Sequence, residues 1–211
     1  MEFVNNYFDK IIFIHCIHRL DRMDNIKKLL DKTKITNYHI LEATYLPKNG
    51  AKGCSHSHYR AMKMALENNW DKVLIIEDDF QFYDDINGIK TDEYFKNTIE
   101  SVSNWDVIMP FWFCNSIEKR SSKINNYIYR ITHKKYGAYS TLCYAVNKSI
   151  MKELQDLFHK SYKNFKDVHD RKQKNISTDC IWRYIQKNKL WYIVTPKLGY
   201  QVETKSDIHC W

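Results

Sequence analysis

Residues 73–79 read Val73-Leu74-Ile75-Ile76-Glu77-Asp78-Asp79, an apolar run that ends in three consecutive carboxylates. The apolar part predicts a strand that is buried on both faces, as strands of parallel sheets are. Ligands of open α/β sheets bind beyond the carboxyl ends of the strands. Because three adjacent acids repel one another, a cation among them is favoured. The stretch therefore predicts either a cation-binding strand end or a solvated acidic turn.

Strand and helix signals alternate on the N-terminal side of this stretch. An apolar, β-branched run predicts a strand over residues 10–15, and helical spacing predicts a helix over residues 24–32. A second strand and helix are predicted over residues 38–43 and 55–68. Strands that alternate with helical crossovers form mainly parallel sheets. We therefore expect an α/β fold whose mixed, mostly parallel sheet is flanked by helices.

The pattern on the C-terminal side is less regular. Helices are predicted over residues 92–102, 148–158 and 178–188. Strands are predicted over residues 105–113, 127–132, 141–146 and 191–195. Residues 117–126 are polar and basic and predict a loop, and the polar residues 201–211 form a tail.

Composition narrows the class of protein. A chain of 211 residues with 44% hydrophobic residues is long enough for one domain with a sizeable core. The net charge of +8 suits anionic ligands. Because the lysines are spread along the chain rather than clustered, nucleic acid is not the expected partner.

The sequence also bears on compartment and redox state. No segment approaches the roughly 18 apolar residues of a membrane span, and the polar residues 1–10 do not match a signal peptide. We therefore expect a cytoplasmic protein, either in a bacterium or as a viral product in a host cytoplasm. The six cysteines include no Cys-x-x-Cys pair, so reduced thiols are expected.

A series of short motifs follows one another along the chain. After the first predicted strand comes Arg19-Leu20-Asp21-Arg22, and the acidic triplet comes later. The other motifs are Gly53-Cys54-Ser55-His56-Ser57-His58, Cys143-Tyr144-Ala145-Val146, Thr178-Asp179, residues 196–201 and Ser206-Asp207-Ile208. In this order they resemble glycosyltransferase family 25, which includes lipopolysaccharide glycosyltransferases and collagen galactosyltransferases. Two places depart from the family pattern: His15-Cys16-Ile17 replaces an Asn-Leu-Asp type sequence, and residues 115–135 match poorly.

The resemblance implies a fold and a reaction. The fold is GT-A, a Rossmann-like glycosyltransferase fold. One such domain would span residues 1–211, with a nucleotide-sugar-binding half at 1–113 and an acceptor-side half and tail at 114–211. The reaction is the inverting transfer of a hexose, with galactose the favoured sugar, from a UDP-sugar to a hydroxyl of a glycan or glycosylated protein. A DXD-type acidic motif would hold Mn²⁺ or Mg²⁺. The oligomeric state does not follow from the sequence.

The metal ligands implied by the resemblance are Glu77 and Asp79. A hard cation bound by carboxylates stabilises the charge that develops on the leaving diphosphate. Asp78 is an alternative ligand or a contact to the donor ribose, because three consecutive residues at a strand end cannot all point the same way. His209 is a further candidate ligand from the tail, and Asp207 is an alternative to it. Both also fit a frayed polar terminus.

An inverting reaction needs a general base for the acceptor hydroxyl. Asp179 is the candidate, since it precedes an apolar helical segment. It also fits a helix-capping or first-turn acid with no role in catalysis.

The donor-binding candidates are Arg19, Asp21, Arg22 and His58, together with Asp78. The first three follow the first strand, where α/β folds place a nucleotide. Arg22 either contacts the diphosphate or forms a surface ion pair with Asp21. His58 either contacts the donor or packs in the core.

Other interpretations stay open. A zinc site is conceivable from the cysteines and histidines at 15, 16, 18, 54, 56 and 58, although their spacing fits no known zinc hairpin. The aromatic residues at 105 and 111–113 form either a sugar platform or core. The rival functions are a catalytically inactive transferase-like domain that binds a nucleotide sugar or glycan, and a basic nucleic-acid-binding domain.

Overall fold

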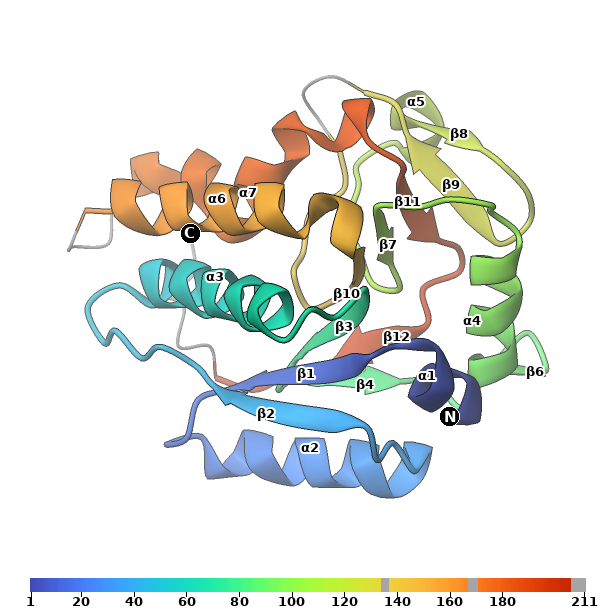
Figure 1. The fold of residues 1–211 in the computed structure, drawn as a ribbon, viewed down its shortest axis with the longest axis horizontal. Helices are drawn as coiled ribbons and strands as arrows, with labels where there is room; N and C mark the ends of the chain where they lie inside the picture. The colour runs from blue at the N-terminus through green and yellow to red at the C-terminus, as the bar shows by residue number, and fades with distance from the viewer. Residues whose placement is uncertain (134–136, 167–170, 206–211) are drawn as a thin grey trace.

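The computed structural model describes residues 1–133, 137–166 and 171–205, and its centre is an eight-stranded sheet (Figure 1). In spatial order the strands are β2 (Tyr38–Glu42), β1 (Lys10–His15), β3 (Lys72–Glu77), β10 (Cys143–Asn147), β7 (Val107–Met109), β11 (Trp191–Val194), β9 (Ile128–Ile131) and β8 (Ser121–Lys123). Two small ribbons pair β4 (Phe80–Phe82) with β12 (Gly199–Gln201), and β5 (Asp85–Ile86) with β6 (Ile89–Lys90).

The sheet is mixed. The first three strands in spatial order, β2, β1 and β3, are parallel, and so are β7 and β11. Strands β10 and β9 run against their neighbours on both sides. Six of the eight strands therefore share one direction, which confirms the expected α/β fold with a mixed, mostly parallel sheet.

Helices cover both faces of this sheet (Figure 1). One face carries α1 (Glu2–Tyr7), α2 (Leu20–Thr33) and α4 (Thr91–Glu100). The other carries α3 (Gly50–Glu67) and α6 (Lys148–Asn164), which lie side by side, and α7 (Thr178–Ile181). The shorter segments are α5 (Ile117–Arg120) and the 3-10 turns η1 (Arg171–Ile176), η2 (Trp182–Tyr184) and η3 (Gln186–Asn188). No helix among the described residues is long and apolar enough to cross a membrane.

Strand alternation divides the core between the two faces. Ile11 and Phe13 of β1 pack on the face of α2, whereas Ile12 and Ile14 pack on the face of α3. Successive side chains of a strand point to opposite faces. The whole of β3 follows this rule, and its alternation continues into the acidic triplet.

Several elements differ from their predicted bounds. The third helix begins at Gly50, five residues before the predicted start, because the Asn49 side chain caps it by accepting a hydrogen bond from the Lys52 amide at 3.0 Å. Strand β7 ends at Met109 because Pro110 lacks the amide that a ladder needs. The predicted loop 117–126 contains α5 and β8, and the predicted helix 178–188 is α7 followed by two 3-10 turns.

Candidate active site

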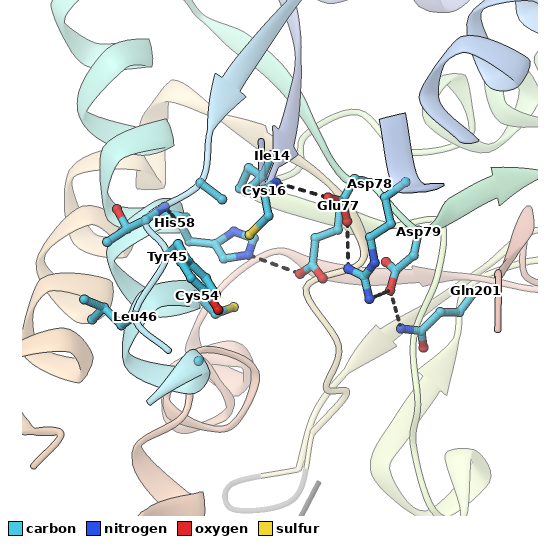
Figure 2. A pocket seen from close by; sticks show the side chains of 15 residues that line it. Ile14, Cys16, Tyr45, Leu46, Cys54, His58, Glu77, Asp78, Asp79 and Gln201 are labelled. Carbon is cyan, nitrogen blue, oxygen red and sulfur yellow. Dashed lines mark hydrogen bonds and ion pairs between the residues drawn. The ribbon is translucent and has the colours of Figure 1, made fainter. Parts of the chain in front are cut away.

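The acidic triplet lies where the carboxyl ends of β1 and β3 adjoin. The chain runs from β1 outward to β2 and then returns to β3 on the far side of β1. This change of direction is the topological switch point at which open α/β sheets bind ligands. Alternation turns Glu77 toward α3 and Asp78 toward α2. Figure 2 shows Glu77 bonded to His58 and Asp79 bonded to Gln201.

Asp78 is held by several donors. Its carboxylate lies 2.9 Å from Nδ1 of His15 and accepts bonds from the Cys16 amide at 3.2 Å and from Nη1 of Arg22 at 2.8 Å. Burial alone would raise the pKa of Asp78, but the bonds from His15 and Arg22 lower it overall. Asp78 is therefore an ionised group whose oxygens bind β1 and α2 to the end of β3.

Asp79 is also buried, but fewer donors contact its carboxylate than contact that of Asp78. Its Oδ2 accepts a bond from Nε2 of Gln201 at 3.0 Å and lies 3.2 Å from Nη2 of Arg22. Its Oδ1 is buried and has no hydrogen-bond partner in the described part of the chain. Burial and the charge of Glu77 raise the pKa of Asp79 to about 6. A buried carboxylate oxygen with no donor is the environment that a bound cation would satisfy.

Glu77 faces the opposite side. Its Oε1 accepts a bond from Oγ1 of Thr141 at 2.6 Å and lies 3.1 Å from Nε2 of His58. The other ring nitrogen of His58 lies 2.8 Å from the Tyr144 hydroxyl. His58 is buried, but it contacts a site carboxylate rather than serving only as core.

Two cavities meet at Glu77. The first, of about 110 Å³, is lined by all three acids, Arg22 and His58, with residues 43–46 on one side. The second, of about 240 Å³, is lined by residues 139–142 and 177–179 and by Phe113. Cys54, Glu77 and Gln201 line both. The arrangement therefore offers two adjoining binding spaces with carboxylates at their junction.

Asp179 lies in the second cavity. It belongs to the first turn of α7, whose N-cap is Ser177, and it accepts a hydrogen bond from the Ser177 hydroxyl at 2.8 Å. The N-cap position is thus filled by another residue, and the Asp179 carboxylate faces a cavity.

The remaining candidates lie around the start of α2. Arg19 donates to both oxygens of Asp21, at 2.9 and 2.6 Å, and to the carbonyl of Lys205 at 2.6 Å. The bond from Arg19 lowers the pKa of the exposed Asp21 to about 2. Neither residue lines the two cavities, whereas Arg22 lines the first. Arg22 also donates to Oγ1 of Thr204 at 3.1 Å, so α2 holds the first part of the tail. His209 and Asp207 lie outside the described residues.

Some site residues carry no signal that sequence reasoning could use alone. Thr141, just before β10, contacts Glu77, and Tyr144 of β10, the strand paired with β3, contacts His58. Tyr144 and Gln201 lie in stretches that resemble the family pattern, and that resemblance was the available hint for both, whereas Thr141 lies in no such motif. Two of the histidines considered for zinc have other partners: Nδ1 of His56 lies 2.8 Å from Oγ1 of Thr44, and Nδ1 of His15 lies 2.9 Å from the Asp78 carboxylate.

Comparison with protein families matches residues 10–182 to glycosyltransferase family 25, described as an LPS biosynthesis protein. No curated protein matches the chain. One similar solved structure is a glycosyltransferase involved in the glycosylation of the major capsid of PBCV-1, at 10% identity over 79% of this chain and 73% of that chain, with a TM-score of 0.44. Another is the glycosyltransferase GlyE of Streptococcus pneumoniae TIGR4, at 11% identity over 89% and 45%, with a TM-score of 0.46. A third is mannose-1-phosphate geranyltransferase from Thermus thermophilus, at 9% identity over 88% and 72%, with a TM-score of 0.46. Likeness at this level says nothing about the activity of this chain.

Proposed function

The chain belongs to glycosyltransferase family 25 and is a glycosyltransferase, and from this premise we propose that it transfers a hexose from a UDP-sugar to a hydroxyl of a glycan or glycosylated protein. Galactose is the favoured sugar, the reaction inverts the anomeric centre, and a divalent cation takes part. The observation that carries the proposal is the junction of two cavities at Glu77, beside the buried and unsatisfied Oδ1 of Asp79.

Charge and ligand chemistry favour a cation at this junction. Glu77, Asp78 and Asp79 bring three carboxylates, and the guanidinium of Arg22 offsets one of them. A divalent cation would balance the remaining two charges. Glu77 and Asp79 would hold Mn²⁺ or Mg²⁺, because Asp78 already accepts three bonds. When bound, the cation acts as a Lewis acid on the donor diphosphate.

We place the donor in the first cavity. At about 110 Å³ this cavity is smaller than pockets that enclose a whole ligand, which measure roughly 300–1,000 Å³. We therefore place the diphosphate and the sugar in this cavity and the nucleoside outside it. Arg22 and His58 line this cavity and would donate hydrogen bonds to phosphate or sugar oxygens. Arg19 and Asp21 contribute by holding the start of α2 and the chain at Lys205.

We place the acceptor in the second cavity. The rings of Phe113 and Tyr139 are stacked there, with centroids 5.6 Å apart and planes 29° apart. Phe113 is 40% exposed, unlike the other aromatic residues of that run that pack in the core. Aromatic faces of this kind suit the apolar faces of a sugar. Asp179 in the same cavity would accept the proton of the attacking hydroxyl.

The test combines binding with turnover. Thermal unfolding is measured with a panel of UDP-sugars, with and without Mn²⁺, because a ligand that binds only the folded state raises its stability by about 2.7 kcal/mol at a hundred times its Kd. The expected result is a rise with one UDP-sugar that requires Mn²⁺, followed by transfer to a glycan acceptor with inversion.

The rival functions give different results. Stabilisation by a UDP-sugar with no transfer to any of a broad set of acceptors would favour the inactive binding domain. No response to nucleotide sugars, together with a strongly salt-dependent affinity for oligonucleotides, would favour the nucleic-acid-binding domain.

A further inference from the structure

We propose that Cys54, His58 and Glu77 form a second metal site, which takes Zn²⁺ or another thiophilic divalent cation. The thiol, one imidazole nitrogen and one carboxylate oxygen of these residues all lie within 4.8 Å of one another. Among the described residues this is the one group of three metal-binding side chains gathered so closely. The site shares Glu77 with the cation of the proposed reaction, so its effect on transfer, though not the site itself, rests on the proposed function.

Local structure brings the two helical ligands together. Cys54 and His58 are four residues apart on α3, so both project from the same face of the helix. Glu77 ends the adjacent strand and points toward that face. His56, two residues from each, points elsewhere and bonds Thr44. The helix therefore selects one cysteine and one histidine out of the cluster that the sequence contains.

Each of the three ligands has a partner that orients it. The Tyr144 hydroxyl lies 2.8 Å from Nδ1 of His58, and Oγ1 of Thr141 donates to Glu77 at 2.6 Å. Oγ1 of Thr178 lies 3.7 Å from Sγ of Cys54. Metal-binding side chains in proteins are characteristically fixed by such outer contacts. Because a hydroxyl can accept as well as donate, Tyr144 can accept a hydrogen bond from Nδ1–H of His58, which leaves the Nε2 lone pair for a metal.

The ligand set discriminates between cations. Sulfur and imidazole ligands favour Zn²⁺ and its softer relatives, whereas Mn²⁺ and Mg²⁺ prefer carboxylate oxygens. The all-oxygen pair Glu77 and Asp79 and the mixed trio thus suit different ions.

The site adjoins both cavities. Cys54 and Glu77 line the donor and the acceptor cavity alike, so a cation can enter from either. Three protein ligands leave the fourth position of a tetrahedral ion vacant for water or a phosphate oxygen. An ion held there would withdraw Glu77 from the donor cation. We therefore expect zinc to inhibit sugar transfer in competition with Mn²⁺.

The site is tested with Co²⁺, which occupies zinc sites and reports thiolate ligation through a charge-transfer absorption in the near ultraviolet. Co²⁺ is titrated into the full chain without nucleotide. The native protein and the control Cys114→Ser should develop the band, and Cys54→Ser should not. Cys114 is a partly buried thiol that lines neither cavity. A native protein without the band, or a band that persists in Cys54→Ser, would overturn the site. If Cys54→Ser unfolds, Cys54→Ala and His58→Gln provide the same comparison.

The competition is tested separately by the electron paramagnetic resonance of Mn²⁺ bound with a UDP-sugar. Zn²⁺ should release Mn²⁺ from the native protein, and Cys54→Ser should need at least about tenfold more zinc, equal to about 1.4 kcal/mol. A cobalt band without release of Mn²⁺ would overturn the shared use of Glu77 and leave the site standing. If Mn²⁺ does not bind at all, the proposed function fails, while the cobalt band still decides the second site.

Discussion

The two cavities that meet at Glu77 are built in different ways. Apart from Gln201, the described residues of the donor cavity's wall come from the first 79 residues: the ends of β1 and β3, helices α2 and α3, and the loop at residues 43–46. The acceptor cavity is walled by segments around residues 113, 140 and 178, which lie in loops or at a helix start. Loops tolerate change better than packed strand ends do. If the two cavities divide the substrates as proposed, the wall that contains strand ends and helices would hold the donor more rigidly than the loop-built wall holds the acceptor.

The largest effect is expected at the donor side of the junction. Asp79→Asn should lower the transfer rate about a thousandfold, since losing a cation ligand removes several kcal/mol of transition-state stabilisation. The melting temperature without metal should not fall, because burial and Glu77 already disfavour the charge on Asp79. Steady-state kinetics and thermal unfolding measure both.

The matched control is Asp24→Asn, at an exposed position of α2 where the carboxylate pairs with Lys27 at 3.4 Å. It should leave the rate unchanged, since exposed pairs contribute little. Equal transfer rates for Asp79→Asn and Asp24→Asn would contradict the proposal that Asp79 holds a cation at the junction.

The next effect separates the two cavities. Asp179→Asn should lower kcat by roughly a hundredfold or more, the usual contribution of a positioned base. The affinity for the UDP-sugar with Mn²⁺ should stay as in the native protein, because Asp179 lines the acceptor cavity and not the donor cavity. Isothermal titration gives the affinity. A normal kcat for Asp179→Asn would mean that Asp179 is not the general base and serves only as an acidic residue in the first turn of α7.

A smaller effect probes the rigidity of the donor wall. A Cβ at Gly53 would lie 2.4 Å from the carbonyl oxygen of Thr44, a backbone atom that cannot turn aside. Gly53→Ala should therefore lower the free energy of unfolding by about 1–3 kcal/mol. Lys63→Ala, an exposed position on the same helix, is the control and should change it little. Urea unfolding measures the free energy of unfolding of both variants. Equal values would show that the loop at residues 44–46 shifts to make room for the added methyl group.

The smallest effect concerns the stacked rings of Phe113 and Tyr139 in the acceptor cavity. Phe113→Ala should raise the KM for a glycan acceptor by up to about tenfold, since an aromatic contact contributes about 0.5–1.5 kcal/mol. The KM for the UDP-sugar should not move. Phe113→Tyr keeps the ring and should behave as the native enzyme does. A change in donor KM instead would mean that the two cavities do not divide the substrates in this way.

The sequence by itself determined the layout of the donor side. Periodicity and the acidic end of β3 predicted the β1–β3 strands, the helices between them and the triplet at their carboxyl edge, because these patterns are local. The tertiary structure decided which acid faces which partner. Glu77 meets Thr141 across 64 positions of sequence, and Asp79 meets Gln201 across 122.

The residues that line the second cavity were also brought together only by the tertiary structure. The predicted strand at 141–146 enters the sheet as β10, antiparallel between β3 and β7, and so carries Thr141 and Tyr144 to the junction. No periodicity within 141–146 specifies those neighbours. Pairing between strands far apart in sequence depends on how the whole sheet buries its two faces. The alternation within one strand, in contrast, follows directly from the order of its own residues.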